Sequence, residues 1–328
     1  MRWLAALLAA LPLATAALAD EAIVTAVQLD HFQNVGIGEP TQGLIFRGGL
    51  ELHSTTDTFG GLSAIGFIDA EGRLVMVSDR GNFVSGQLIY DDKGAPLSVV
   101  GVRIDPIQNS KGADLPRAFA RDAEALAIIE RPDNMSVVRI GFENLTRVAD
   151  FHLENGIPTG AAIDVTIPEW LTATRTNESL EAVCVAPSTS PIAGSTLLLT
   201  EGVIDNDGAH SGWLLGKNDK GPLSYRSGDV TDPTDCAFLP NGDLLVLERG
   251  VVLINFAARL VRIKAADVKP GTEMKGDILF EATGGDLDNL EGVAVHQTAS
   301  GETRITLISD NNFNDWERNL LLEFTLPD

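Results

Sequence analysis

The sequence predicts an all-β protein, a single β-propeller of four-stranded antiparallel blades, with five blades favoured and six possible. A short hydrophobic strand opened by Ser or an acid recurs five times, and each copy is followed by a strand that closes on another acid. The openings begin at Leu62, Ala123, Leu180, Thr234 and Leu290. From Ser63 to Glu291 the opening motifs are 61, 57, 54 and 56 residues apart. This period is too long for a small solenoid repeat and is typical of propeller blades.

The first nineteen residues have the pattern of a secretory signal. Met1-Arg2 precedes an Ala/Leu run, and Ala17-Leu18-Ala19 precedes Asp20. We expect cleavage after Ala19 and a periplasmic or secreted protein. Residues 20–328 then form one domain, because the evenly spread repeats leave no linker. No later stretch has the roughly 20 apolar residues needed to span a bilayer.

The chain is strongly acidic, with 46 acidic and 24 basic residues and a net charge of −22. Removal of Arg2 with the signal brings the mature charge to about −23. This charge repels nucleic acid and anionic lipid, so neither is expected as a partner. Divalent cations and cationic partners suit it better, although an acidic surface also serves solubility alone.

Each repeat is predicted to form a meander of four short strands. The opening and closing strands meet across turns such as 69–72 and 240–243, which are rich in Gly, Pro, Asn and Asp. Outer strands are expected at 87–90, 97–104, 148–153, 161–167, 260–263 and 277–281. Short helices are expected only near 168–170 and 314–318.

The last repeat has one clear strand, 320–326, after its closing motif. The N-terminal segment 44–52 is predicted to supply the missing outer partner, which would join the two ends of the chain and remove an open sheet edge. Residues 22–47 add a further strand or part of a degenerate sixth blade.

Antiparallel geometry predicts that the motif acids share one end of the propeller. The first residue of one strand of a hairpin lies beside the last residue of the next. We therefore expect an inner ring and a second tier at one mouth of the central channel, with Ser63 as a ring-lining hydroxyl. The ring is Glu124, Glu181, Asp235 and Glu291, and the second tier is Asp79, Glu143, Glu201, Glu248 and Asp310.

So many ionised carboxylates repel one another in a constricted space unless cations bind, protons bind, or arginines pair with them. Arg80 and Arg249 are the nearby arginines. Carboxylate and amide oxygens favour Ca²⁺, with Mg²⁺ as the alternative, over Zn²⁺. The metal ligands predicted from the sequence are Asp79, Glu124, Glu181, Glu201, Asp235, Glu248, Glu291 and Asp310. The competing interpretation is structural, since acids at strand ends often accept backbone hydrogen bonds in turns.

The motifs also carry a family resemblance. They are Gly60-Gly61-Leu62-Ser63, Ser78-Asp79-Arg80-Gly81, Asp122-Ala123-Glu124-Ala125, Phe238-Leu239-Pro240-Asn241-Gly242-Asp243, Leu247-Glu248-Arg249, Asp288-Asn289-Leu290-Glu291-Gly292 and Ser309-Asp310-Asn311-Asn312-Phe313. As an ordered series from about Gly48 to Leu326, they resemble the phytase-like family described as having esterase-like activity. The resemblance implies a repeated β domain whose acids hydrolyse phosphoester or related ester bonds.

Other hydrolase chemistries find little support. Gly61-Leu62-Ser63-Ala64-Ile65 lacks the second glycine of a nucleophile elbow. The five histidines form no zincin or histidine-phosphatase motif. Cys184 and Cys236 stand three and one residues after their motif acids, and this shared parity predicts two buried thiols that do not face each other.

The sequence thus favours a hydrolase with a small anionic ester or phosphoester substrate, acting as a monomer. One or two Ca²⁺ ions would polarise the substrate oxygen and help to generate hydroxide. Glu124, Glu181, Asp235 and Glu291 are the candidate metal or base positions, and Arg80 and Arg249 would clamp the substrate. The alternatives are a non-catalytic ligand- or metal-binding propeller of the cell envelope and a single-metal lactonase-like enzyme.

Overall fold

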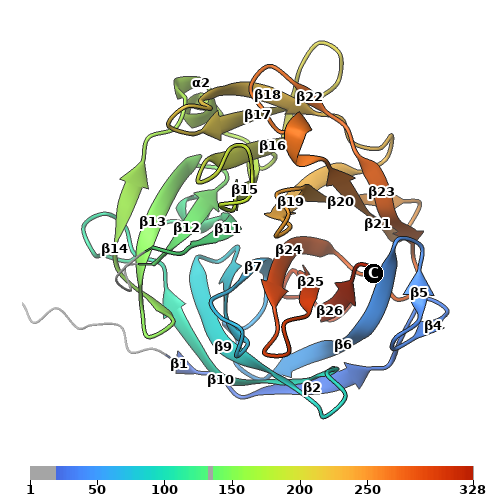
Figure 1. Ribbon diagram of the computed structural model, residues 1–328. Coiled ribbons are helices and arrows are strands. Elements are labelled where there is room, and N and C mark those ends of the chain that lie inside the picture. Colours follow the sequence, from blue (N-terminus) through green and yellow to red (C-terminus); the bar gives the residue numbers. More distant parts are fainter. Residues whose placement is uncertain (1–19, 132–135, 328) are drawn as a thin grey trace, which may run out of the picture.

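Five antiparallel sheets surround one axis in the computed structural model, which describes residues 20–131 and 136–327 (Figure 1). The strand that opens each repeat is the innermost strand of its sheet, and the five inner strands pack side by side around the axis. The predicted five-bladed propeller is therefore confirmed. The predicted signal segment, residues 1–19, lies outside the described residues.

The first three blades follow the chain from the axis outward. Blade one is β7 (Leu62–Phe67), β8 (Arg73–Ser78), β9 (Asn82–Tyr90) and β10 (Pro96–Pro106), with β1 (Asp20–Glu21) at its outer edge. Blade two is β11 (Ala123–Ile129), β12 (Val137–Phe142), β13 (Arg147–Glu154) and β14 (Ile157–Val165). Blade three is β15 (Leu180–Val185), β16 (Thr196–Ile204), β17 (His210–Leu215) and β18 (Gly221–Tyr225), with β22 (Glu273–Met274) parallel to β18.

The last two blades complete the ring. Blade four is β19 (Asp232–Phe238), β20 (Leu244–Val252), β21 (Asn255–Ile263) and β23 (Asp277–Thr283). Blade five is β24 (Leu290–Gln297), β25 (Thr303–Ser309), β26 (Asn319–Thr325), β6 (Leu44–Ser54) and β2 (Val24–Leu29), with β5 (Pro40–Thr41) also paired to β6. The predicted pairing of the two ends of the chain is confirmed, since β26 pairs with β6 in antiparallel register.

The sixth blade left open by the sequence does not form. The N-terminal residues instead become outer strands of blades one and five and the small hairpin of β3 (His31–Phe32) and β4 (Val35–Gly36). These strands cover sheet edges that would otherwise present unpaired backbone groups.

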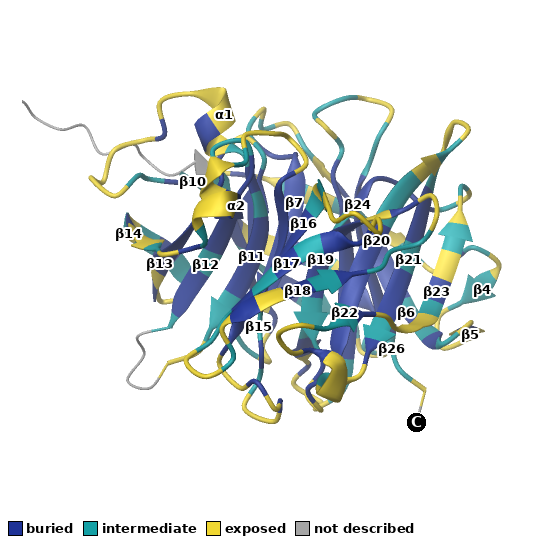
Figure 2. Ribbon diagram, turned by 90° about the horizontal axis from the view of Figure 1, so that it is seen from above, coloured by how far each residue is buried: buried dark blue, intermediate teal, exposed yellow. Residues whose placement is uncertain are grey.

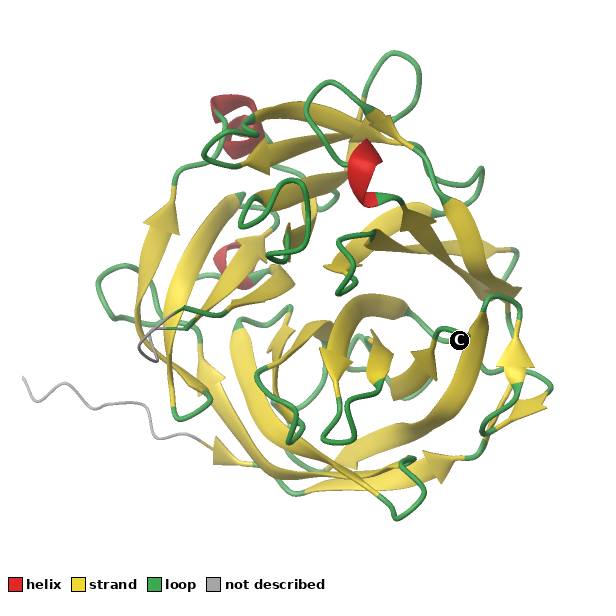
Figure 3. Ribbon diagram, viewed as in Figure 1, coloured by secondary structure: helices red, strands yellow, loops and turns green. Residues whose placement is uncertain are grey.

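Helices are few and short (Figure 3). Within residues 20–131 and 136–327 they are α1 (Ala118–Arg121), α2 (Glu169–Ala173) and a 3₁₀ turn at Ala265–Asp267. The helix predicted near residues 168–170 is present as α2, whereas residues 314–318 form turns instead of a helix. In these turns the side chain of Asn314 accepts the N–H groups of Trp316 and Glu317. Among the described residues, no helix is long and apolar enough to cross a membrane.

The hydrophobic core lies between the blades. Five apolar clusters fill the five spaces between neighbouring sheets, and the largest joins blades four and five through Phe32, Phe46, Phe280 and Phe324. Figure 2 shows buried strands between two ends covered by exposed loops, with α1 and α2 at the upper end. Packing fixes the strands and leaves the loops at the two ends free to carry function.

Candidate functional site

All five inner strands carry the same backbone irregularity at the same end. The pairing of each inner strand with its neighbour skips one residue, which is the pattern of a β-bulge. The skipped residues are Ser63, Glu124, Glu181, Thr234 and Glu291. A bulge re-aims a side chain out of the regular alternation, so each blade offers one such residue at this end of the axis.

A second set of acids is fixed by an equally regular hydrogen bond. In four blades the N–H of the closing acid donates to the carbonyl oxygen of the residue two places before the bulge, at 2.9–3.2 Å. The donor and acceptor pairs are Asp79 and Gly61, Glu143 and Asp122, Glu201 and Ser179, and Asp310 and Asn289. The second tier is therefore placed beside the bulges by the backbone itself.

Blade four departs from this pattern by placing Thr234 at the bulge and Arg249 where the other blades have an acid. The Arg249 guanidinium lies 3.2 Å from the Glu291 carboxylate and 3.5 Å from that of Glu201. It also donates to Oδ1 of Asn289 at 2.9 Å. The ring of acids is thus interrupted once, by a cation that contacts an acid on each neighbouring blade.

The structure corrects the predicted place of Asp235, which is one residue past the bulge. Side chains alternate along a strand, so an offset of one residue redirects the side chain. The fully buried Asp235 carboxylate accepts the N–H groups of Cys236 and Val293, each at 2.8 Å. Val293 belongs to the neighbouring inner strand, so Asp235 satisfies an edge N–H of β24 instead of joining the other acids.

Glu248 is displaced for the same reason, because Arg249 takes the position that the sequence assigned to it. Glu248 is fully buried. It accepts hydrogen bonds from the Tyr225 and Thr231 hydroxyls, the Gly228 N–H and the Arg259 guanidinium. These bonds tie blade four to the segment that enters it, and they leave Glu248 outside the acidic cluster.

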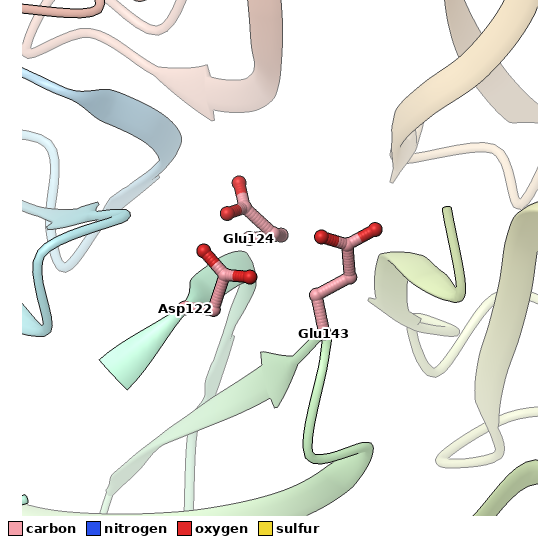
Figure 4. Close-up of side chains that lie close together, drawn as sticks. All are labelled: Asp122, Glu124 and Glu143. Atoms are coloured by element: carbon pink, nitrogen blue, oxygen red, sulfur yellow. The ribbon is translucent and has the colours of Figure 1, made fainter. Parts of the chain in front are cut away.

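The remaining acids converge most closely around Glu143. Carboxylate oxygens of Asp122, Glu124 and Glu143 lie within 4.8 Å of one another, and so do those of Glu143, Glu181 and Glu201. Figure 4 shows Asp122, Glu124 and Glu143 with their carboxyl groups turned toward a shared space. We refer to these five residues as the Glu143 cluster.

Asp122 is a member of this cluster that the repeat pattern did not predict. It stands two residues before the bulge, a position that holds Asp232 in blade four and Asn289 in blade five. Alignment of the repeats at the position two residues before the bulge shows side chains there that can offer oxygen to a metal ion.

Burial is the largest cause of raised pKa values throughout the site. It raises the pKa of Asp79 to about 6, of Glu143 and Asp310 to about 7, and of Glu291 to about 8. The pKa values of Glu124 and Glu181 lie well above the usual range, because burial is reinforced by Asp122 near Glu124 and by Glu143 near Glu181. Without a cation, Glu124, Glu143 and Glu181 therefore hold protons near neutral pH.

The acid of blade one, Asp79, lies beside Gly61 and the aromatic ring of Phe313. The exposed Arg80 guanidinium lies 3.2 Å from the ring centre of Phe313, and Asn311 accepts the Gly61 N–H at 3.1 Å. Gly61 has a φ of 62°, and a Cβ there would collide with both Asp79 and Phe313. Only glycine fits, so the backbone at this position is built to let Asp79 and Phe313 approach.

A separate cavity of about 890 Å³ occupies the other end of the inner strands. Its lining begins two residues beyond the bulges, at Ile65, Leu126, Val183, Cys236 and Val293. The lining includes none of the five residues of the Glu143 cluster. The acidic site and this cavity are therefore different ends of the same axis.

The prediction of two free thiols is wrong, because Cys184 and Cys236 form a disulfide with their Cα atoms 5.8 Å apart. The reason is the offset in blade four. Counted from the bulges, Cys184 is three residues after Glu181 and Cys236 is two residues after Thr234. Opposite parity on neighbouring inner strands turns the two side chains toward each other.

Two solved structures and one family model match this chain over most of its length. The fold is similar to the endo-arabinase from Bacteroides thetaiotaomicron, at a TM-score of 0.51 and 12% identity, covering 83% of this chain and 96% of that one. A PQQ-bound aldose sugar dehydrogenase from Streptomyces coelicolor has a TM-score of 0.43 and 12% identity, covering 85% and 98%. No curated protein matches the sequence. Residues 57–313, which contain every acid of the site, match the family described as "Phytase-like: Esterase-like activity of phytase", and the chain belongs to that family.

Proposed function

We propose that this protein is a divalent-metal-dependent hydrolase of phosphoester or related ester bonds, with its active site at the Glu143 cluster. The observation that carries the proposal is the convergence of five carboxylates from two blades, in two groups that share Glu143. Membership of a family described by esterase-like activity supports the reaction class.

The donor set fits a hard cation. Every member of the Glu143 cluster offers carboxylate oxygen, which favours Ca²⁺, or Mg²⁺ as the alternative. The buried Oγ1 of Thr234 at the ring position of blade four has no hydrogen-bond partner among the described residues, which leaves one more oxygen without a role. Asp122, Glu124, Glu143, Glu181 and Glu201 would hold the ion. When bound, such an ion supplies Lewis-acid polarisation of a substrate oxygen and lowers the pKa of water.

The surrounding residues supply substrate binding and proton transfer in this proposal. Arg249 is three-quarters buried between Glu201 and Glu291, and its guanidinium is the cation available to an anionic phosphoryl or acyl oxygen. Arg80 lies on Phe313 at the exposed side and provides a second cation. Glu291, whose pKa is raised to about 8 mainly by burial, can hold or release a proton near neutral pH.

We infer an exported protein. The Cys184–Cys236 disulfide supports this location, because structural disulfides persist in oxidising compartments such as the periplasm. Its position between the inner strands of blades three and four places it three residues from Glu181, within the framework that holds the site.

The test is an assay of metal-free protein on phosphodiester, phosphomonoester, carboxylic ester and lactone substrates, with and without added Ca²⁺ or Mg²⁺. Turnover of an ester or phosphoester that requires the ion, and that is lost in Glu181→Gln while the fold is retained, supports the proposal. Faster turnover of lactones would identify the lactonase-like alternative. Calcium-dependent stabilisation without turnover of any class would overturn the enzyme claim and leave a metal-binding propeller.

A further inference from the structure

The end of the propeller that carries the acids also carries exposed apolar side chains. Six of them stand on strand ends and loops of blades three, four and five at that end, and we call them the apolar rim. They are Ile204, Val230, Val251, Leu253, Ile254 and Trp316, exposed by 58, 59, 60, 92, 94 and 90% respectively. Ile204 and Val251 stand at the ends of the second strands β16 and β20, Leu253 and Ile254 form the following turn, Val230 precedes the inner strand β19, and Trp316 lies between β25 and β26, which places all six at the acidic end.

Contacts between neighbouring loops hold the apolar rim in place across blades four and five. The carbonyl of Val230 packs so closely on the β20–β21 hairpin that Gly250 has no room for a Cβ. Gly284 lies against Asn255 at the tip of the same hairpin, and Asp288 pairs with Arg318 at 3.0 Å in the loop that carries Trp316. The loops therefore support one another as a single surface.

Leu253, at the tip of the β20–β21 hairpin, is unfavourable both in its backbone conformation and in its exposure to water. Val252 pairs with Asn255, so Leu253 and Ile254 form the two-residue turn. Leu253 has a φ of 60°, a left-handed conformation that Gly or Asn adopts far more readily than a branched apolar residue. The side chain is also almost entirely in water. A residue that is unfavourable in both its backbone conformation and its exposure indicates that this surface is covered by a partner when the protein functions.

We propose that the apolar rim docks the protein on a zwitterionic lipid surface, with the acidic mouth facing the headgroups. The apolar side chains project from separate loop tips, which enter a deformable headgroup layer more easily than they fit a rigid protein face. Tryptophan favours the membrane interface. The negative charge of this end favours zwitterionic lipid. The acidic cluster repels anionic lipid and attracts the ammonium groups of zwitterionic lipid, and the acids beside the tips do the same; these are Asp229, Asp315 and Glu317. Docking would bring lipid esters to the Glu143 cluster, a consequence that rests on the proposed function.

The test is flotation of the full-length protein with phosphatidylcholine vesicles in EDTA, so that no turnover is required. We expect the wild type to float with the vesicles and to lose binding as anionic phosphatidylglycerol is added. The variant Leu253→Asn/Ile254→Ser removes the two most exposed side chains and relieves the strained backbone, so it should fold. We expect its partition coefficient to fall by about tenfold or more.

The matched control is Ile163→Ser/Ile278→Ser, which removes two half-exposed apolar residues from outer strands β14 and β23. It should bind within about twofold of the wild type. Wild-type protein that stays in solution at millimolar phosphatidylcholine would overturn the proposal, and so would equal loss of binding in both variants. Light scattering that shows a dimer lost only in the tip variant would assign the rim to a second copy of the chain. Absence of hydrolysis with intact, tip-dependent flotation would defeat the proposed function alone.

Discussion

Replacing Glu143 with Gln removes one negative charge from the point shared by both groups of carboxylates. The neutral side chain keeps the oxygen that accepts the Ser179 N–H at 3.0 Å, and its amide can donate to Glu181. We expect Glu143→Gln to stabilise the metal-free protein at high pH and to abolish its stabilisation by calcium. A conservative change at a merely structural acid would have neither effect.

The magnitude follows from the pKa of Glu143, which burial raises from 4.5 to about 7. The native state then binds more protons at this residue than the unfolded chain does between pH 4.5 and 7. The stability due to Glu143 is thus fully present below pH 4.5 and is lost as pH rises through 7. At about 1.4 kcal/mol per pKa unit, the ionised carboxylate costs about 3 kcal/mol at pH 8. Glutamine does not ionise, so the variant avoids this cost.

The assay is urea unfolding at pH 5 and pH 8, in EDTA and in millimolar Ca²⁺. In EDTA at pH 8 the variant should exceed the wild type by up to about 3 kcal/mol, whereas at pH 5 the two should agree within about 1 kcal/mol. A wild-type gain of about 3 kcal/mol is expected at a calcium concentration 100 times Kd, and little or none in the variant. The control Glu154→Gln changes an exposed acid at the end of β13 in the same blade and should alter nothing. A variant less stable than the wild type in EDTA at pH 8, or equally stabilised by calcium, would refute the reasoning.

Three further changes test individual contacts. Arg249→Gln should raise KM for a phosphoester at least about tenfold and leave KM for an uncharged ester within about twofold, because the guanidinium binds the anionic oxygen. Equal changes in KM for both substrates in initial-rate measurements would count against that role of Arg249. Asp235→Ala strands the Val293 N–H and should lower the free energy of unfolding by about 2 kcal/mol with unchanged turnover per folded molecule; lost turnover at full stability would instead make Asp235 catalytic. Cys184→Ser opens a disulfide that spans 52 residues and should lower the free energy of unfolding by about 4 kcal/mol, by the chain-entropy model. A reductant should destabilise the wild type by the same amount in urea unfolding. An unchanged free energy of unfolding in both experiments would contradict a stabilising role of the disulfide.

The repeat spacing was enough to predict the architecture. Regular intervals between the opening motifs predict blades of similar size, and the single strand left at the C-terminus predicts closure by the N-terminal segment, which β6 provides. Both inferences depend on strand number and order, which hydrophobic runs and turns reveal directly.

The details of blade four were beyond that reasoning. Thr234 and Asp235 are adjacent, and the sequence pattern favours the acid as the repeat position. The backbone instead skips Thr234, which turns the Asp235 carboxylate toward the neighbouring strand β24, puts Arg249 in place of Glu248, and turns Cys236 toward Cys184. One unrecognised bulge therefore accounts for two misplaced acids and the missed disulfide.

The measurement that most directly tests the shared acidic site is anomalous diffraction from crystals grown with Mn²⁺ at pH 8, with Glu143→Gln crystals as the control. We predict an anomalous peak at ligand distance from Glu143 and at least two other members of its cluster, absent from the variant. A map without a peak there, or with ions bound only at other surface acids, would contradict the account.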